Sequence, residues 1–532
     1  MTELDPRRWL REARRAFARL PTLRLGRIPD APALPVRDPW PGDPGRGATL
    51  LKGELGIGGA TCVLRQGNWG HGASPAQLAA IHGFTWLRDL RSLGTDPARL
   101  LARALVSDWI AGGASDPIAQ RPDVAGARIA AWFGHYDFFA ATADDGFRQK
   151  LMARLVSDAR SLSAALPAEE LDARALTALK GLIAAAVALP EHAGLLTRAL
   201  RFLPQELARQ VLPDGCLVER SPAAQLTALQ DLTEIRALLQ ASQTPPPTML
   251  AAAIERMAPA LRVMRHGDGG LALFNGTKEE TAALVDLVLT QAGRGGRGPS
   301  SLTNGGFQRM QAGRSLLLVD CGAPPPPGLD RFAHAGTLSM ELSIGRERLI
   351  VNCGAFPAGP AEWRDALRMT AAHSTLVLAD LSSSEIKPEG LGRRPEDVKV
   401  QRQEANGAHW LELEHDGWRR SLGAIHRRSL YMAESGEDIR GEDTIEASQP
   451  LSFTLRFHLH PDVPASVQQD GEAVLLRLKS GSGWRLRANG ARLSLEESVY
   501  FGGPEMRRSE QVVLTGTADG PQTVKWAIIK FG

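Results

Sequence analysis

The residue pattern changes near residue 300 from one typical of helices to one typical of strands, and this change restricts the fold more than any other feature of the sequence. From about 75 to 292, Ala- and Leu-rich runs of helical length alternate with breakers such as the Pro-Asp-Gly at 213–215. After the Gly- and Arg-rich stretch at 293–301, short runs typical of β-strands follow, each bounded by Gly, Asp or Pro. Helices first and strands afterwards indicate separate domains instead of an α/β fold.

Each half is compatible with its own small set of architectures. Successive helices joined by short loops pack antiparallel, so about seven or eight of them form a bundle, a solenoid or a toroid. The periodicity does not choose among these three. Many short strands at close spacing indicate an antiparallel sandwich or barrel.

Composition excludes several classes of partner. The chain has 62 basic and 59 acidic residues and a net charge of +3, which is too even for the one-sided basic surface of a nucleic-acid-binding protein. No run approaches about 18 uninterrupted apolar residues, so we expect no membrane span. The four cysteines are far apart in sequence, which favours neither a disulfide framework nor a Cys-based zinc site.

The first 50 residues form a segment of their own. Residues 1–20 predict a basic amphipathic helix, which either packs on the body of the protein or attaches to a membrane surface. Residues 21–50 are rich in Pro, Gly and Arg, and they predict an irregular wrap over the surface. Because the start lacks an apolar stretch with a cleavage site, the expected compartment is the cytoplasm.

Three segments, in the same order as the motifs of a known family, resemble those motifs. They are LPDGCLVERSPAAQL at 212–226, HAGTLSMELSIGRERLIVNCGA at 334–355 and RMTAAHSTLVLADLSSSE at 368–385. Together they resemble the signature regions of the heparinase II/III family of polysaccharide lyases. The resemblance implies an incomplete (α/α) toroid over 51–300, followed by an antiparallel β-sandwich over 301–532.

The resemblance also implies an activity and a partner. The family's enzymes are carbon–oxygen lyases that act by β-elimination on uronic-acid polysaccharides, so an acidic polysaccharide is the expected partner. A base removes the proton beside the sugar carboxylate, and an acid protonates the leaving glycosidic oxygen. A bacterial periplasm or cell envelope is then the alternative compartment, and a homodimer is left open.

The family's site histidines correspond to His334 and His373. In the family, matching histidines join an aspartate in a metal site, whose position here is Asn352. The three residues therefore hold a divalent metal, zinc or calcium, or they form a hydrogen-bonded structural cluster without a metal.

Glu219 and Arg220 match a Glu-Arg pair of the family motif. Arg220 either binds a substrate carboxylate through its planar guanidinium or forms a buried ion pair that holds its loop. The tyrosine and histidine that the family carries just after this pair are Ala224 and Gln225 here.

The helical half offers further candidates. His135 and Tyr136 are replacement candidates for the acid or base, and Trp132 beside them is suited to stacking on a sugar ring. Trp86 and Arg88 are candidate substrate-binding residues near the start of the helical region. The competing interpretation is an aromatic helix face packed in the core, with Arg88 in an interhelical ion pair.

Two functions follow from these residues, and a third alternative is an interaction scaffold whose two domains only pack and present surfaces. The first is an active lyase with His334, His373, Glu219 and Arg220 near its cleft. The second is a catalytically altered member that binds an acidic envelope glycan without cleaving it. This is favoured by Ala224 at the family's tyrosine, by Phe332 where family members often carry an earlier histidine, and by Asn352 at the aspartate.

Overall fold

The computed structural model describes residues 28–112, 115–167, 172–192, 194–293, 298–468 and 471–531. Contacts divide the chain into a helical unit, Met1–Gln210 with Thr227–Ile254, and a sheet unit, Val211–Leu226 with Glu255–Gly532. The predicted basic helix at 1–20 lies outside the described residues. Two stretches from the predicted helical region, 211–226 and 255–300, belong by their contacts to the sheet unit.

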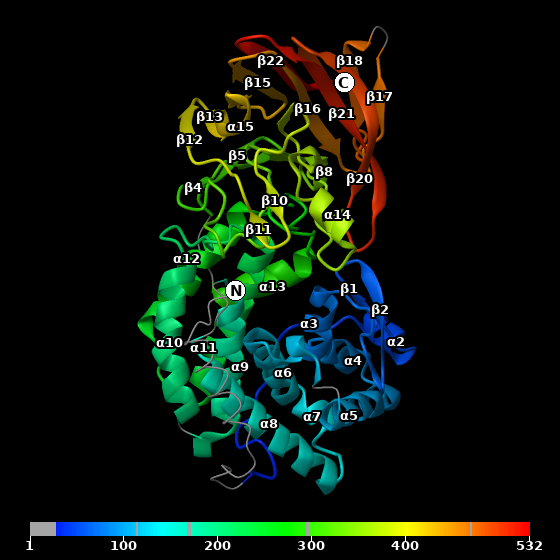
Figure 1. Cartoon of the computed structure of the whole chain (residues 1–532), viewed down its shortest axis with the longest axis vertical. Helices are drawn as coiled ribbons and strands as arrows, with labels where there is room; N and C mark the ends of the chain where they lie inside the picture. The colour runs from blue at the N-terminus through cyan, green and yellow to red at the C-terminus, as the bar shows by residue number, and fades with distance from the viewer. Residues whose placement is uncertain are drawn as a thin grey trace, which may run out of the picture. The chain divides into compact units, whose positions relative to one another are not determined.

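The helical unit consists of antiparallel helices and one small sheet, drawn in blue to green in Figure 1. Its helices are α2 (Pro44–Leu51), α3 (Pro75–Gly83), α4 (Leu87–Leu93), α5 (Asp96–Ala111), α6 (Pro122–Gly134), α7 (Tyr136–Phe139), α8 (Asp145–Ala165), α9 (Arg174–Ala188) and α10 (Gly194–Gln210). Helices α11 (Pro222–Ala241) and α12 (Thr248–Val263) each have one end in this unit. The small antiparallel sheet comprises β1 (Glu54–Ile57), β2 (Ala60–Arg65) and β3 (Asn68–Trp69).

Helices α6 and α9 are the inner helices of this unit. Nearly every residue of both is buried, as expected when other helices surround them. Their backbones touch at two glycines: a Cβ added to Gly181 would lie 2.2 Å from the carbonyl oxygen of Gly126. Turn residues set the helix starts, since Ser74, Thr95 and Asp144 each cap a helix through a side-chain oxygen.

The sheet unit is a sandwich of two large antiparallel sheets, in yellow to red at its C-terminal end in Figure 1. One sheet has the order β12-β13-β14-β15-β22-β19-β18-β17, and the other runs β20-β21-β16-β8-β7-β6-β5-β4, with β9 paired to β16. The strands of the first are β12 (Val398–Ala405), β13 (Ala408–Trp418), β14 (Ala424–Met432), β15 (Asp438–Ala447), β17 (Ala465–Val467), β18 (Ala473–Arg477), β19 (Gly483–Asn489) and β22 (Gln522–Phe531). Those of the second are β4 (Ser301–Leu302), β5 (Phe307–Ala312), β6 (Ser315–Asp320), β7 (Met340–Ile344), β8 (Glu347–Val351), β9 (Leu376–Leu378), β16 (Leu451–Leu459), β20 (Arg492–Tyr500) and β21 (Arg507–Ala518).

The core of the sandwich lies between the two sheets. Strand β14 alternates buried and less buried residues, as a strand with one face in a core does. The rings of Phe457 on β16 and Trp526 on β22 meet edge to face, 4.9 Å apart. Smaller elements complete the unit: α13 (Ala282–Ala292), α14 (Ala361–Ala366), α15 (Arg419–Leu422), and the hairpin of β10 (Ile386–Lys387) and β11 (Gly390–Leu391).

Strand β7 differs from β14 because it is buried on both faces. Its outer face is covered by the 264–281 segment of the same unit, whose His266 contacts Glu341 and Ser343 at 2.7 and 3.1 Å. This segment and the loop at 211–226 position the residues of the family motifs.

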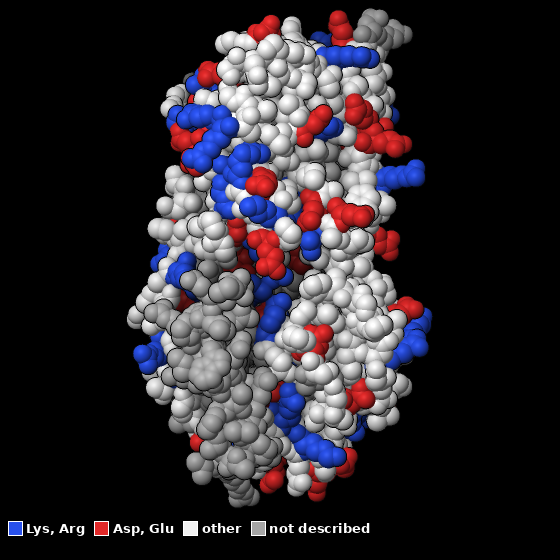
Figure 2. Space-filling model, in the orientation of Figure 1, with Lys and Arg blue, Asp and Glu red and all other residues white. Residues whose placement is uncertain are grey.

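Two surface properties bear on partners. Among the described residues, no helix is long and apolar enough to cross a membrane. Basic and acidic side chains are interspersed on the face of the sheet unit that Figure 2 shows, without a continuous field of one sign.

Candidate functional site

The structure brings His334 and His373 into direct contact in the sheet unit. His334 lies in the loop before β7, and His373 ends the short 3-10 helix Thr370–Ala372. The Nδ1 atom of His334 lies 3.0 Å from the Nε2 atom of His373. The backbone N–H of Gly276 donates to His334 Nε2 at 2.9 Å, and the carbonyl oxygen of Met369 lies 2.8 Å from His373 Nδ1.

These three contacts determine where the protons lie. Because His334 Nε2 accepts a hydrogen bond, the proton of the neutral ring is on Nδ1 and is donated to His373. His373 then carries its proton on Nδ1 and donates it to the Met369 carbonyl. Burial lowers the pKa of His373 to about 4, and burial with the neighbouring His373 and Arg368 lowers the pKa of His334 further. In this arrangement both rings are neutral, and all four ring nitrogens are engaged within the protein.

Asn352 is buried in a separate set of hydrogen bonds. Its Oδ1 accepts from the backbone N–H of Ser374 at 2.9 Å, and its own N–H donates to Glu341 at 2.9 Å. Among the described residues, no group of three or more His, Cys, Asp or Glu side chains is arranged to hold a metal ion. With every imidazole lone pair engaged and an amide at position 352, these residues do not fit a divalent metal.

Arg220 is buried in the loop that precedes α11, in the left-handed backbone region at φ 54°. Its guanidinium pairs with Asp320 at the end of β6. It also donates to the carbonyl oxygens of Gly305 at 2.6 Å and Ala323 at 2.9 Å. Glu219 beside it is 2% exposed. The contacts of Arg220 thus join the loop at 211–226, here called the family-motif loop, to the first strands of the sandwich.

Gln225 occupies the position of the family's histidine and is fully buried. Its Oε1 accepts from the N–H of Leu217 at 2.8 Å. Its Nε2 donates to the carbonyl oxygens of Gly215 at 2.8 Å and Met257 at 3.2 Å. The amide therefore ties the Pro-Asp-Gly turn to α12. Ala224, at the position of the family's tyrosine, carries no acid or base.

The aromatic candidates of the helical unit lie in its core. Trp86 and Trp132 are 3% and 0% exposed, and both rings contact Phe84 at about 5 Å between centroids. Tyr136 is 7% exposed. The ring of Trp132 also meets that of Trp109 edge to face, 5.4 Å between centroids.

His135 and Arg88 meet at a carboxylate from the N-terminal segment. Asp38 accepts from Arg88 Nε at 3.0 Å and Nη2 at 2.9 Å, and His135 Nε2 lies 3.1 Å from the same oxygen. Although burial acts to raise it, the pKa of Asp38 is held below its usual range by His135 and Arg88. The predicted site residue Arg88 therefore has an ion-pair partner within the protein.

Arg88 and Asp38 line a pocket of the helical unit, here called the Lys180 pocket, with a cavity volume of about 130 Å³. Lys180 on α9 lies 2.7 Å from Asp231 and 3.3 Å from Glu234, both on α11. Despite burial, these two carboxylates raise the pKa of Lys180. Trp40 donates to Glu234 from its indole nitrogen, and the other polar lining residues are Arg37, Thr85, Thr177, Thr227 and Gln230.

Sequence reasoning missed Lys180, Asp231, Glu234 and Asp38. A signal existed for Lys180, because it is a charged residue inside the apolar stretch ALKGLIAAAVA of α9. No signal pointed to Asp38, which lies in a Pro-rich stretch without periodicity.

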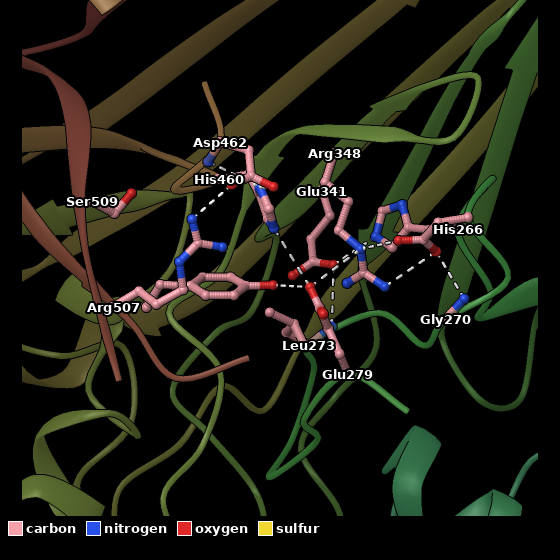
Figure 3. A network of polar contacts seen from close by, with 12 residues as sticks. His266, Gly270, Leu273, Glu279, Glu341, Arg348, His460, Asp462, Arg507 and Ser509 are labelled. Carbon is pink, nitrogen blue, oxygen red and sulfur yellow. Dashed lines mark hydrogen bonds and ion pairs between the residues drawn. The ribbon is translucent and has the colours of Figure 1, made fainter. Parts of the chain in front are cut away.

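A further buried network ties the 264–281 segment to the sandwich (Figure 3). Arg348 on β8 lies 2.7 Å from Asp268 and 3.6 Å from Glu279. Tyr500 donates its hydroxyl to Glu279. Burial acts to raise the pKa of Glu279, but His460 and Arg348 outweigh it and lower this pKa to about 2. Glu279 is thus a charged anchor of the segment that also carries Asn275 and Gly276.

Comparisons with known proteins agree with this architecture. The family model described as "Heparinase II/III-like, C-terminal" matches residues 294–527. A crystal structure of heparinase III superposes with a TM-score of 0.74 at 12% identity, covering 98% of this chain and 89% of that one. The heparan sulfate lyase HepC from Pedobacter heparinus superposes with a TM-score of 0.58 at 16% identity, covering 98% of this chain and 87% of that one. The predicted order of a helical toroid followed by an antiparallel sandwich is confirmed.

The chain belongs to the heparinase II/III family. Within it, the chain is similar to FtsZ-localized protein C of Caulobacter vibrioides, strain NA1000 / CB15N. The two are 32% identical over 518 residues, which cover 93% of this chain and 89% of that protein.

Proposed function

We propose that this chain is a non-cleaving member of the heparinase II/III family that binds an acidic glycan. The observation that carries the proposal is the closed His334–His373 pair, in which each ring nitrogen already has a partner within the protein. A general base must reach the proton that it removes with a free lone pair. Neither imidazole offers one without breaking a buried hydrogen bond.

The acid side of the reaction has the same difficulty. β-Elimination needs a group that protonates the leaving oxygen, and the family places a tyrosine and a histidine for this purpose at 224 and 225. Ala224 has no proton to give, and the Gln225 amide neither titrates near neutral pH nor leaves its three buried hydrogen bonds. The loss of both groups supports binding without cleavage.

The Lys180 pocket supports the binding half of the proposal. Arg37, Arg88 and Lys180 line it with the side chains of Thr85 and Thr177. Three carboxylates also line it: Asp38 pairs with Arg88, and Asp231 and Glu234 pair with Lys180. Guanidinium groups suit carboxylates and sulfates because they donate two parallel hydrogen bonds. Asp38 already occupies Arg88, because one of its carboxylate oxygens accepts from both Nε and Nη2, so an acidic sugar would bind there by replacing Asp38.

The test combines cleavage and binding in one preparation. Heparan sulfate, alginate and hyaluronan are incubated with the protein, the absorbance of an unsaturated uronate is followed, and binding is measured by calorimetry. We expect no absorbance change with any polymer and saturable binding to at least one. Lys180→Met should weaken that binding, whereas Arg99→Gln, at an exposed ion pair of the same unit, should not. A product from wild-type protein would refute the non-cleaving role, and failure of all three polymers to bind would refute the glycan role.

A second function is favoured by the similarity to FtsZ-localized protein C. We propose that this chain also localises with FtsZ, because the two sequences match over nearly their full lengths. Purified chain mixed with FtsZ polymers should co-sediment with them, and it should stay in the supernatant when FtsZ is unassembled. Equal amounts in both supernatants would contradict this second proposal without affecting the first.

A further inference from the structure

A second pocket of the helical unit lies apart from the residues discussed so far. It opens between the loop that joins β3 to α3, the C-terminal end of α5 and the start of the 3-10 helix Pro117–Gln120. Its cavity volume is about 980 Å³. The side chains that the argument uses are His82, Trp69, Asp108, Asp116, Asn68 and Ala111. We call it the His82 pocket.

His82 lines this pocket and carries a buried hydrogen-bond donor. The side chain lies on α3 in a residue that is 1% exposed, and its Nδ1 accepts from the indole N–H of Trp109 at 3.0 Å. Burial lowers the pKa of His82 to about 4, so the ring is neutral at pH 7 and its single proton is on Nε2. Among the described residues, nothing accepts a hydrogen bond from that Nε2. A buried donor without an acceptor is unfavourable, and a ligand oxygen would relieve this.

Trp69 provides an aromatic wall beside this donor. Its ring stacks on that of His82 with 6.2 Å between centroids and 21° between planes. The indole N–H donates to Asp108 Oδ2 at 2.8 Å, and the backbone N–H of Gly67 donates to the same oxygen at 2.8 Å. These bonds fix the orientation of the half-buried ring, so its position does not depend on a ligand.

Two of the pocket's other polar side chains, Asp108 and Asp116, are carboxylate acceptors, beside Asn68, His71 and Ser115. Asp108 uses Oδ2 to hold Trp69, and Asp116 uses Oδ1 to cap the 3-10 helix through the N–H of Ile118 at 2.7 Å. These hydrogen bonds do not use Asp108 Oδ1 or Asp116 Oδ2, which can accept from a ligand. No Lys or Arg is among the described residues that line the pocket.

This combination selects the chemistry of a ligand. An anion would accept from His82 but would meet two aspartates without a compensating cation. An ammonium group would suit the aspartates but has no lone pair for the His82 proton. A hydroxyl group does both, because it accepts from one neighbour and donates to another. A sugar has adjacent hydroxyls on a ring, and the ring has an apolar face that can lie against an indole.

We propose that the His82 pocket binds an uncharged sugar residue. In this arrangement a sugar hydroxyl accepts from His82 Nε2 and another donates to Asp108 or Asp116. The apolar face of the ring lies on Trp69. The site differs from the Lys180 pocket in its residues and in the charge of its ligand, so neither proposal depends on the other.

The test titrates the full chain with three uncharged probes: maltotetraose, cellotetraose and chitotetraose. Binding is measured by calorimetry, and folding of each variant by thermal unfolding. Ala111→Trp fills the pocket from an exposed position on α5, and Trp69→Ala removes the aromatic wall. Trp363→Ala removes an exposed tryptophan of the sheet unit and is the matched control.

We expect saturable binding of at least one probe by the wild-type chain and the Trp363 variant. Binding should be about tenfold weaker or lost in the Ala111 and Trp69 variants, since an aromatic contact of this kind contributes about one order of magnitude. Binding of acidic polymers should be the same in all four proteins. The proposal is overturned if no probe binds the wild type, or if both pocket variants bind a probe as tightly as the wild type does.

Discussion

The sharpest test of how the family-motif loop works is the removal of the Arg220 guanidinium. Arg220→Met keeps most of the length of the side chain and removes its charge. In the structure, this change leaves the buried Asp320 without its cation and takes a donor from the carbonyl oxygens of Gly305 and Ala323. Breaking one side of a buried pair costs about 3–5 kcal/mol. With two carbonyls also orphaned, we expect a loss near the top of that range.

The assay is differential scanning calorimetry, because the helical unit and the sheet unit can unfold in separate transitions. A loss of about 5 kcal/mol corresponds to roughly 8 °C in the melting temperature of a unit of this size. The double variant Arg220→Met with Asp320→Asn should recover part of the loss, since the buried charge is gone. As a control, Arg440→Met removes an exposed partner of Asp438 and should cost less than about 1 kcal/mol.

Two outcomes would refute this reasoning. If the free energy of unfolding of Arg220→Met lies within about 1 kcal/mol of that of the wild type, the pair with Asp320 does not stabilise the fold. If it keeps its stability and loses binding of an acidic glycan, Arg220 is a ligand for the sugar carboxylate, which is the other role that the sequence allows.

Three further predictions follow from the buried polar groups. First, His373 binds a proton near pH 6.5 in the unfolded chain but only near pH 4 in the folded chain. The free energy of unfolding therefore falls as the pH falls from 6.5 to 4, by up to about 1.4 kcal/mol per pH unit. Urea unfolding at pH 7 and 5 should show a smaller difference for His373→Asn than for wild type; equal differences would contradict the assignment. Second, an excess of zinc or calcium should not shift the melting temperature, because the ring nitrogens of His334 and His373 are engaged; a shift that disappears in His334→Asn would show a metal site. Third, Gln225→Leu should cost about 1–3 kcal/mol in urea unfolding, because the N–H of Leu217 loses its buried acceptor; an unchanged midpoint would mean that this amide is dispensable.

The order of helices and strands could be predicted because it rests on local signals. Breakers such as Pro-Asp-Gly and the change of period near 300 are visible in any window of the sequence. The stretch 126–141 has the pattern of a single helix, but it belongs to α6, Pro122–Gly134, and the short α7 that follows, because the chain turns at Gly134 and His135. Such boundary errors come from packing, which a local window does not contain.

The site could be predicted only in part, for the same reason. The resemblance placed His334 and His373 in one cluster, and the structure has them 3.0 Å apart. The sequence could not show that every ring nitrogen has a partner within the protein. Two of these partners are the backbone groups of Gly276 and Met369, which tertiary contacts bring to the rings. Likewise, helical spacing looks the same whether Trp132 faces a sugar or a core.

The most direct test of the account is the mass of an acidic oligosaccharide after it has occupied the protein. A heparan sulfate hexasaccharide held at saturating concentration is recovered and weighed by mass spectrometry. We expect a single species with the mass of the starting material. Two fragments whose masses add up to that of the parent, with no added water, would show β-elimination and contradict the account.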